Sequence, residues 1–344
     1  MAIFHSSGVY RYIFGDLKRY FSNFDTLHYI LRTQGRIMDY QAVLNEIAEE
    51  IKPYIGQGKV ADYIPALAEV DPHQFGMTLT LFDGMQYSVG DADTLFSIQS
   101  ISKVFTFTLA LDAYGYDLYR RVGREPSGNP FNSLVQLEYE HGIPRNPFIN
   151  AGAINVTDAL ISHYGSVALT SKEILGFIRE IAGNGMIESD KVVTESEMQH
   201  GFRNRALANL MKSFGNLDND VLEVVHTYFE HCAIAMNTRT LSRAMLYLAN
   251  HGEDPITGKK FITPQQAKRI NAVMLTCGHY DASGDFAFHV GLPGKSGVGG
   301  GIVAVIPKRL GLCVWSPALN EQGNSLAGTK ALELFTSKTG LSIF

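Results

Sequence analysis

Residues 96–105 read Phe96-Ser97-Ile98-Gln99-Ser100-Ile101-Ser102-Lys103-Val104-Phe105. A serine hydroxyl is scarcely ionised at neutral pH, so a serine nucleophile needs a neighbouring base. In a helix, Lys103 supplies that base to Ser100, because side chains three residues apart share one face with Cβ atoms about 5–6 Å apart. If Ser100 opens the helix, the positive end of the helix dipole also favours its alkoxide. The stretch therefore predicts a nucleophilic site at Ser100, although a Ser/Lys pair on a solvated helix face has the same spacing.

The residues around this motif predict strands before it and a helix after it. An apolar helix is expected from Lys103 to Tyr114, and an amphipathic helix from Asp39 to Tyr54. Residues 77–82 and 86–90 alternate in polarity around Asp83-Gly84, which predicts a β-hairpin with a two-residue turn. The N-terminal part of the chain thus supplies a hairpin to a sheet.

The C-terminal part returns to short apolar segments bounded by turns. Strands are expected at 286–290, 301–306 and 310–315, followed by a helix from about Gly323 to Ser337. Strands at both ends with a helical middle predict an α+β fold rather than alternating βαβ units. We expect an antiparallel sheet built from the N- and C-terminal parts, flanked by helices, with an inserted helical domain.

Two subdomains and an extension follow from this pattern. The sheet subdomain is expected at about 60–115 plus 285–344, and the helical subdomain at about 116–284. Residues 1–37 are aromatic and basic and differ from the catalytic domain at 38–344, so we interpret them as an N-terminal extension of unknown role. Met38 is a plausible initiator.

Composition excludes several classes of protein. The chain has 344 residues, of which 45% are hydrophobic and 18% charged, and its net charge is −5. Without a basic block, nucleic acid is not expected as a partner, and no apolar run is long enough for a membrane span. No signal peptide is evident, and the three cysteines lack CxxC spacing, so we expect a cytoplasmic enzyme without disulfides or zinc.

A Ser-x-x-Lys acyl-transfer site needs a Lys-[Ser/Thr]-Gly strand beside the serine. The triplet at Lys338 lies at the end of the last predicted helix, where glycine is an ordinary terminator. The triplet Lys295-Ser296-Gly297 precedes two strands and a helix, and its glycine-rich continuation lets the backbone approach a ligand closely. A phosphate loop is excluded there, because His289 occupies the position of the required glycine.

Two further segments are candidates for the site. Residues 146–153, Asn-Pro-Phe-Ile-Asn-Ala-Gly-Ala, are equally typical of a loop with Asx turns. Tyr280, within residues 277–281, is a base candidate if nearby cations lower its pKa.

These motifs together make the chain similar to the serine-dependent glutaminases, a family with the β-lactamase/penicillin-binding-like fold, in its bacterial type. The similarity covers about residues 38–344 and leaves out the first 37. The matching segments are Val60–Pro65, Gln99–Lys103, Asn146–Ala153, Ser196–Glu197, Arg203–Asn204, Tyr228–Phe229, Cys277–Asp281, Phe286–Pro293, Lys295–Val298 and Trp315–Pro317.

The resemblance implies an L-glutamine amidohydrolase that gives L-glutamate and ammonia through a glutamyl ester of Ser100. Lys103 and Tyr280 are implied as the two proton-transfer groups, and the sequence leaves open which of them takes the first proton. The backbone amides of Ser100 and Val298 are implied to hold the oxyanion, a kind of donor whose loss typically costs about 10²–10³ in turnover.

The resemblance also implies a binding set for the amino-acid end of glutamine: Asn150, Glu197, Asn204 and Tyr228. Tyr63 is implied to lie near the reacting amide. A carboxylate accepts hydrogen bonds from the substrate ammonium, while amides and a phenol donate to its carboxylate. Taken singly, Glu197 is equally typical of a solvated surface carboxylate, and Tyr63 of a packing residue at a helix start.

No metal or organic cofactor is implied, because the serine chemistry is self-contained. Family members assemble as dimers or tetramers, so a homodimer or homotetramer is expected. Two other hypotheses remain at this point: an acyl-transfer enzyme acting on peptides or β-lactams, and a non-catalytic amino-acid sensor. The acidic residue that class A β-lactamases use for deacylation has no recognisable motif here, and the intact Ser100, Lys103 and Tyr280 disfavour a sensor.

Overall fold

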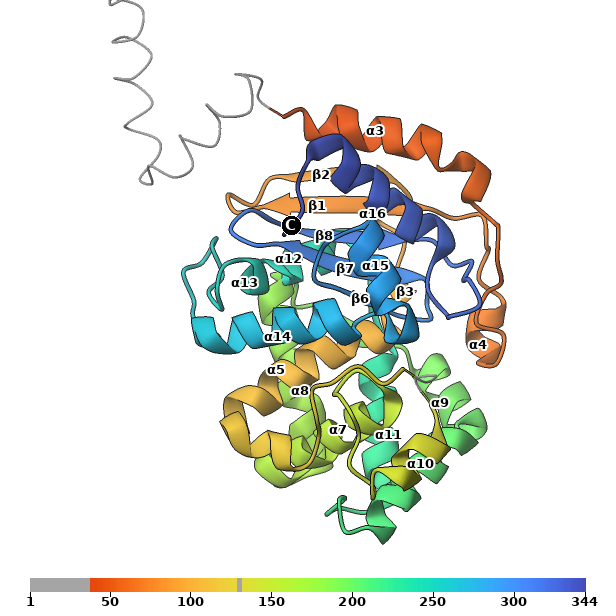
Figure 1. Cartoon of the computed structure of the whole chain (residues 1–344), viewed down its shortest axis with the longest axis vertical. Coiled ribbons are helices and arrows are strands. Elements are labelled where there is room, and N and C mark those ends of the chain that lie inside the picture. The colour runs from red at the N-terminus through yellow and green to blue at the C-terminus, as the bar shows by residue number, and fades with distance from the viewer. Residues whose placement is uncertain (1–37, 129–131) are drawn as a thin grey trace, which may run out of the picture. The chain divides into compact units, whose positions relative to one another are not determined.

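The two ends of the chain meet in one antiparallel sheet of five strands. The computed structural model describes residues 38–128 and 132–344. Within them the strand order is β2-β1-β8-β7-β6, so the N-terminal hairpin pairs with the last strand rather than with its neighbours in sequence (Figure 1). The strands are β1 (Gly76–Leu81), β2 (Gln86–Gly90), β6 (Gly294–Ser296), β7 (Gly301–Ile306) and β8 (Leu310–Trp315).

Helices cover both faces of this sheet, which explains why β7 and β8 are apolar throughout rather than alternating. On one face, α12 is tied to β1 by hydroxyl pairs from Thr78 to Thr238 (2.8 Å) and from Thr80 to Ser242 (2.7 Å). The opposite face is packed by α16, which β8 contacts (Figure 1). Every residue of β7 and β8 is buried.

The helical part lies between β2 and β6 in sequence, as predicted. Its central element is α5, most of whose residues are buried because it packs against α7, α8 and α14 (Figure 1). The helices of the described residues are α3 (Tyr40–Glu50), α4 (Pro65–Ala68), α5 (Ser102–Tyr114), α6 (Leu134–Tyr139), α7 (Asn150–Tyr164), α8 (Val167–Ala182), α9 (Lys191–His200), α10 (Phe202–Ser213), α11 (Val221–Cys232), α12 (Thr238–Ala244), α13 (Leu246–Ala249), α14 (Pro264–Cys277), α15 (Ser283–His289) and α16 (Leu326–Thr339), with 3₁₀ turns η1 (Lys52–Tyr54), η2 (Gln99–Ile101), η3 (Gly115–Arg120) and η4 (Tyr280–Ala282).

A second, three-stranded sheet joins the nucleophile segment to the helical part. It consists of β3 (Phe96–Ser97), β5 (Ile234–Met236) and β4 (Glu188–Ser189), in the order β3-β5-β4. Sequence patterns did not predict it, because strands of two or three residues are too short to show alternation. Its consequence is that the residues before Ser100 are held by backbone pairing to the end of α11.

Three expectations are wrong in detail. Residues 286–290 were expected as a strand, but residues 286–289 belong to helix α15 and Val290 caps its C-terminal end, with Phe286 and Val290 both buried. The hairpin has three residues in its turn, 82–84, because Gly84 adopts a φ of +87°. Ser100 lies in η2, one turn before α5 begins, instead of opening that helix.

The predicted extension at 1–37 lies outside the described residues. The expected helix at 39–54 is found as α3 followed by η1, and the last helix as α16, which ends with Gly340 in the left-handed conformation. Among the helices at 38–128 and 132–344, none combines the length and the apolar character needed to cross a membrane.

Candidate active site

The turn that presents Ser100 has a strained backbone. Gln99 has a φ of +48°, a conformation that non-glycine residues adopt rarely and at a cost of about 1–3 kcal/mol. The Ser102 hydroxyl donates to the Gln99 carbonyl at 2.7 Å and is 2.8 Å from Nδ1 of the buried His231. These contacts hold the turn in place, and Ser100 within it is only 6% exposed.

Lys103 lies on the first turn of α5 and is completely buried. Its Nζ donates to Oδ1 of Asn150 at 2.7 Å and to the carbonyl oxygen of Phe148 at 3.2 Å. It also lies 5.7 Å from the ring centre of Tyr228 and 5.8 Å from that of Tyr280. Burial lowers the pKa of Lys103 to about 8, so the neutral amine is far more accessible near neutral pH than for an exposed lysine.

A chain of side-chain amides leads from Lys103 to α10. The Lys103 amine donates to Oδ1 of Asn150, and Nδ2 of Asn150 donates in turn to Oδ1 of Asn204 at 2.9 Å. Because Oδ1 of Asn204 accepts from Asn150, the Nδ2 group of Asn204 points away from Asn150 and remains to donate to another acceptor. The loop before Asn150 is an Asx turn in which Asn146 Oδ1 accepts from the backbone of Phe148 at 3.0 Å, and Asn150 follows it as the first residue of α7.

A second chain leads from the nucleophile turn to α9. The Gln99 side chain donates through Nε2 to Ser97 Oγ at 2.9 Å and to Glu197 Oε1 at 3.0 Å. Glu197 is 6% exposed, so its interpretation as a solvated surface carboxylate is wrong. Burial raises the pKa of Glu197 to about 7, opposed by the hydrogen bond from Gln99 and by Lys103.

Tyr280 lies at the start of η4 with a φ of +58°. Its ring is 4.2 Å from Nζ of Lys295, which donates to the carbonyl oxygens of Gly278 (2.9 Å) and Ser296 (2.6 Å). Burial raises the pKa of Tyr280, and a hydrogen bond with the Ser100 side chain opposes this increase. The expectation that nearby cations lower this pKa is therefore wrong: the phenol is neutral, and its hydroxyl interacts with the candidate nucleophile.

The remaining predicted binding residues lie on elements around this centre. Tyr228, on α11, is 3% exposed, and burial raises the pKa of its phenol well above the usual value. Tyr63 lies in the loop before α4, which α9 holds through a hydrogen bond from the Ala66 amide to Ser196 Oγ at 3.3 Å. Tyr63 is 56% exposed as a residue, and the pKa of its phenol is raised by burial of the hydroxyl end and by the nearby Glu197 carboxylate. Tyr63 thus lies at the rim of the site.

The glycine-rich loop after β6 runs directly against the Ser100 turn. A Cβ atom added to Gly297 would lie 2.5 Å from the Ile98 carbonyl oxygen and 3.3 Å from the backbone nitrogen of Ser100. One added to Gly299 would lie 2.2 Å from the Ser97 carbonyl oxygen. Only glycine permits this approach, which brings the backbone around Val298 beside the backbone amide of Ser100.

We expect Gly297→Ala to lower kcat by at least about 100-fold, the scale of losing one oxyanion donor, because its Cβ forces this loop away from Ser100. Steady-state kinetics on glutamine would measure the loss, with KM changing far less. Gly284→Ala in α15 is the matched control, since its Cβ meets no atom within 4 Å. Equal kinetics for the two variants would contradict the role of close approach.

Sequence reasoning missed Gln99 and Ser102 as parts of the site. In the sequence Gln99 was only the residue before Ser100. Its importance appears in the structure, where it has a positive φ and its side chain donates a hydrogen bond to Glu197. No group of three His, Cys, Asp or Glu side chains able to hold a metal ion occurs within the part of the chain that the structure describes.

Comparison with known proteins identifies a single family. The sequence model of the family described as Glutaminase matches residues 58–344. A glutaminase of Aliarcobacter butzleri is 62% identical over 307 residues, which are 89% of this chain and 100% of that protein. Among solved structures, the probable glutaminase ybaS has a TM-score of 0.83 at 36% identity and covers 88% of this chain and 98% of its own. Mglu in its glutamate form has a TM-score of 0.84 at 35% identity, covering 90% of this chain and 70% of its own.

Proposed function

The chain belongs to the glutaminase family, and from that premise we propose that Ser100 is its nucleophile and that Lys103 and Tyr280 move the protons. As a glutaminase with a β-lactamase-like fold, the enzyme hydrolyses the side-chain amide of L-glutamine to L-glutamate and ammonia. Two chains of hydrogen bonds support the residue assignment. One runs from Gln99, beside Ser100, to Glu197, and the other runs from Lys103 through Asn150 to Asn204.

Lys103 takes the first proton in this proposal. A neutral amine has two N–H donors and one lone pair, and the carbonyl oxygens of Asn150 and Phe148 account for both donors. The lone pair is then left to accept the Ser100 proton. Burial favours Lys103 over Tyr280 as the base. It lowers the pKa of Lys103 to about 8, which makes the neutral amine accessible, and it raises the pKa of Tyr280, which keeps the phenol protonated.

The acylation step then proceeds through a tetrahedral intermediate. The Ser100 oxygen bonds to the side-chain carbonyl carbon of glutamine as its proton moves to Lys103, and the negative charge develops on the carbonyl oxygen. The backbone amides of Ser100 and Val298 stabilise that charge. The carbon–nitrogen bond breaks as the leaving nitrogen receives a proton, which Tyr280 donates and regains from Lys103, and ammonia departs. Water then hydrolyses the glutamyl ester by the reverse sequence of proton transfers.

The amino-acid end of glutamine binds between α9, α10 and α11. Glu197 accepts hydrogen bonds from the α-ammonium, held in orientation by the Gln99 amide. Asn204 offers its Nδ2 donors to the α-carboxylate, with Tyr228 and Asn150 beside it. Tyr63 closes the rim near the reacting amide. A glutamate-bound structure of Mglu supports a product site within this fold.

Glu197→Gln is expected to raise KM for glutamine about 10- to 100-fold with little change in kcat. The substitution removes the ammonium's charged partner, and charge-assisted hydrogen bonds contribute about 1.5–3 kcal/mol. Glutamine at this position still accepts from Gln99 through its amide oxygen, so the site's shape is kept. Initial-rate kinetics over a wide glutamine range measure the effect, and an unchanged KM would show that Glu197 does not bind the ammonium.

An ammonia-release assay tests the residue assignment as a whole. Wild type and Ser100→Ala are compared on glutamine, asparagine and a chromogenic β-lactam. We expect ammonia from glutamine with wild type alone and no β-lactam hydrolysis by either. Turnover retained by Ser100→Ala would overturn the nucleophile assignment without affecting the family membership.

We also propose three properties of the whole protein. Residues 38–344 form the catalytic domain, with the sheet and helical subdomains bounded near 60–115 plus 285–344 and 116–284. The enzyme acts in the cytoplasm, in keeping with its three free, buried cysteines. It assembles as a homodimer or homotetramer, which light scattering coupled to size-exclusion chromatography would distinguish from a monomer.

A further inference from the structure

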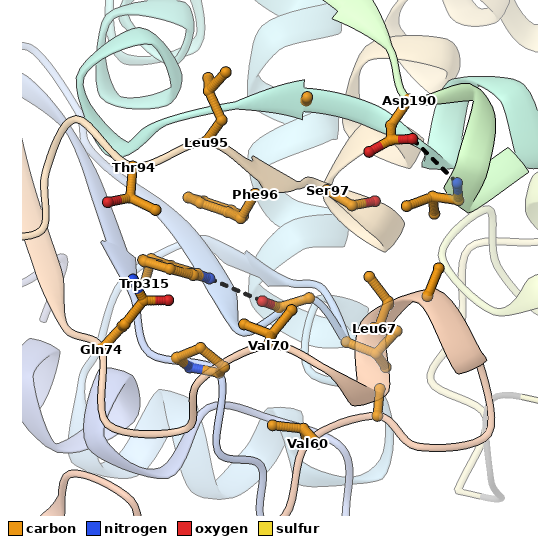
Figure 2. Close-up of a pocket in the computed structure, with 17 residues that line it drawn as sticks. Val60, Leu67, Val70, Gln74, Thr94, Leu95, Phe96, Ser97, Asp190 and Trp315 are labelled. Carbon is orange, nitrogen blue, oxygen red and sulfur yellow. Dashed lines mark hydrogen bonds between the residues drawn. The ribbon is translucent and has the colours of Figure 1, made fainter.

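Trp315, the only tryptophan of the chain, contacts both segments that carry the oxyanion donors. Its Nε1 donates to the carbonyl oxygen of Gly299 at 2.9 Å, next in sequence to Val298. Its ring is stacked on Phe96, with centres 5.0 Å apart and planes 3° apart. Phe96 begins β3, four residues before Ser100. Figure 2 shows the Trp315 indole facing the Phe96 ring, with the hydrogen bond from its nitrogen drawn as a dashed line.

The glycine-rich loop and Trp315 border the same pocket. This pocket has a volume of about 380 Å³ and is lined by Val298 and Gly299 together with Phe96 and Trp315 (Figure 2). On the side of the Ser100 turn the loop is closely packed, because Cβ atoms added to Gly297 and Gly299 would overlap the backbone there. Gly299 also lines the pocket, and its carbonyl oxygen is held by the indole hydrogen bond.

Few hydrogen bonds connect the glycine-rich loop to the rest of the described structure. Gly300 donates to the Gly297 carbonyl at 2.9 Å, and Gly297 to that of Gly301 at 2.9 Å, both within the loop and its strand. The Ser316 amide donates to the Gly300 carbonyl at 3.0 Å from the end of β8. The hydrogen bond from Trp315 differs from these, because it comes from a side chain that also stacks on Phe96 of β3, the strand before Ser100.

We propose that Trp315 is a positioning residue that fixes the spacing between the Ser100 and Val298 amides, by joining the glycine-rich loop to the strand that leads to the nucleophile. The inference rests on the proposed role of those two amides as the oxyanion hole. Its consequence is that loss of the indole N–H affects transition-state stabilisation and leaves ground-state binding of glutamine unchanged, because the charge on the carbonyl oxygen develops only during reaction.

The sole tryptophan allows this hydrogen bond to be deleted without altering any other residue. A tryptophan auxotroph supplied with 3-benzothienylalanine places sulfur where Trp315 has its N–H and keeps the fused ring that stacks on Phe96. We expect kcat on glutamine to fall about 10-fold while KM changes less than twofold. The part-buried Gly299 carbonyl then lacks its donor, and the free energy of one hydrogen bond typically corresponds to about this change in rate.

Enzyme labelled with 5-fluorotryptophan is the matched control, since its ring is also modified but its N–H remains. We expect its kcat and KM to lie within twofold of the unlabelled enzyme. Equal kcat values for the benzothienyl and fluorotryptophan enzymes would overturn the proposal. So would a rise in KM with unchanged kcat, which would indicate a role in substrate binding.

If the benzothienyl enzyme does not fold, Phe96→Leu tests the same link from the other side. This variant keeps the indole N–H and removes its stacked partner, and we expect kcat to fall about threefold at constant KM. An unchanged kcat would overturn the proposal. Ser100→Ala, measured in parallel, tests the nucleophile assignment separately, so failure of the two ideas can be told apart.

Discussion

Ser100→Ala is expected to lower kcat by about 10⁴–10⁶-fold, the range typical for removal of a serine nucleophile. The variant should still bind glutamine, because the groups proposed to hold its amino-acid end lie on α9, α10 and α11 and keep their own hydrogen bonds. Titration calorimetry with glutamine would measure the binding, and a coupled assay for ammonia the turnover. Near wild-type turnover would show that another group attacks the amide.

Ser102→Ala is the control for this prediction, because Ser102 lies in the same short motif. Its hydroxyl bonds to the Gln99 carbonyl and to His231 rather than pointing at substrate. We expect its loss to relax the strained turn and to reduce kcat only about 10-fold. A larger loss in Ser102→Ala than in Ser100→Ala would reverse the roles of the two serines.

Lys103→Met is expected to lower kcat by about 10³–10⁴-fold, near the upper range for loss of a general base. Methionine is similar in length and apolar, so it fits a side-chain position that is completely buried. Lys103→Arg is the matched control: it keeps the positive charge but cannot release a proton near neutral pH. If the arginine variant stayed active, Lys103 would act through its charge and not as a base.

The pH dependence of the same variant supplies an independent test. The pKa of Lys103 falls from 10.5 to about 8 on folding, so between those values the unfolded chain binds more protons. The free energy of unfolding therefore rises with pH between about 8 and 10.5, by up to about 1.4 kcal/mol per pH unit. Below pH 8 the full cost of burying the charged amine is present. Unfolding by denaturant at several pH values should show this slope in wild type and its reduction in Lys103→Met.

The same pKa sets an expectation for the wild-type rate. The amine must be neutral to accept a proton, so kcat/KM should rise with pH up to about 8. Glu197, with a pKa raised to about 7, adds a second loss below neutrality. A pH profile without either step would contradict both assignments.

Local patterns in the sequence predicted much of the architecture. The hairpin at β1 and β2 follows from strict alternation, and β7, β8 and α16 from apolar segments bounded by turns. The strand prediction at 286–290 failed because a short segment with four apolar residues in five fits a strand and a helix equally well. Packing decided between them: Phe286 stacks on His279 with ring centres 3.5 Å apart, and Phe288 is 84% exposed.

The ordered motifs of the sequence by themselves determined the family, the fold class and the identity of the candidate site residues. They did not determine how those residues act, because pKa values and backbone strain arise from burial and from contacts between distant segments. The lowered pKa of Lys103, the protonated phenol of Tyr280 and the strained Gln99 exist only once α5, α7 and the loop after β6 enclose the Ser100 motif. In the sequence the four residues Ser100 to Lys103 are only a spacing, and the tertiary structure decides their burial, their hydrogen bonds and the pKa of Lys103, because these depend on segments far apart in the chain.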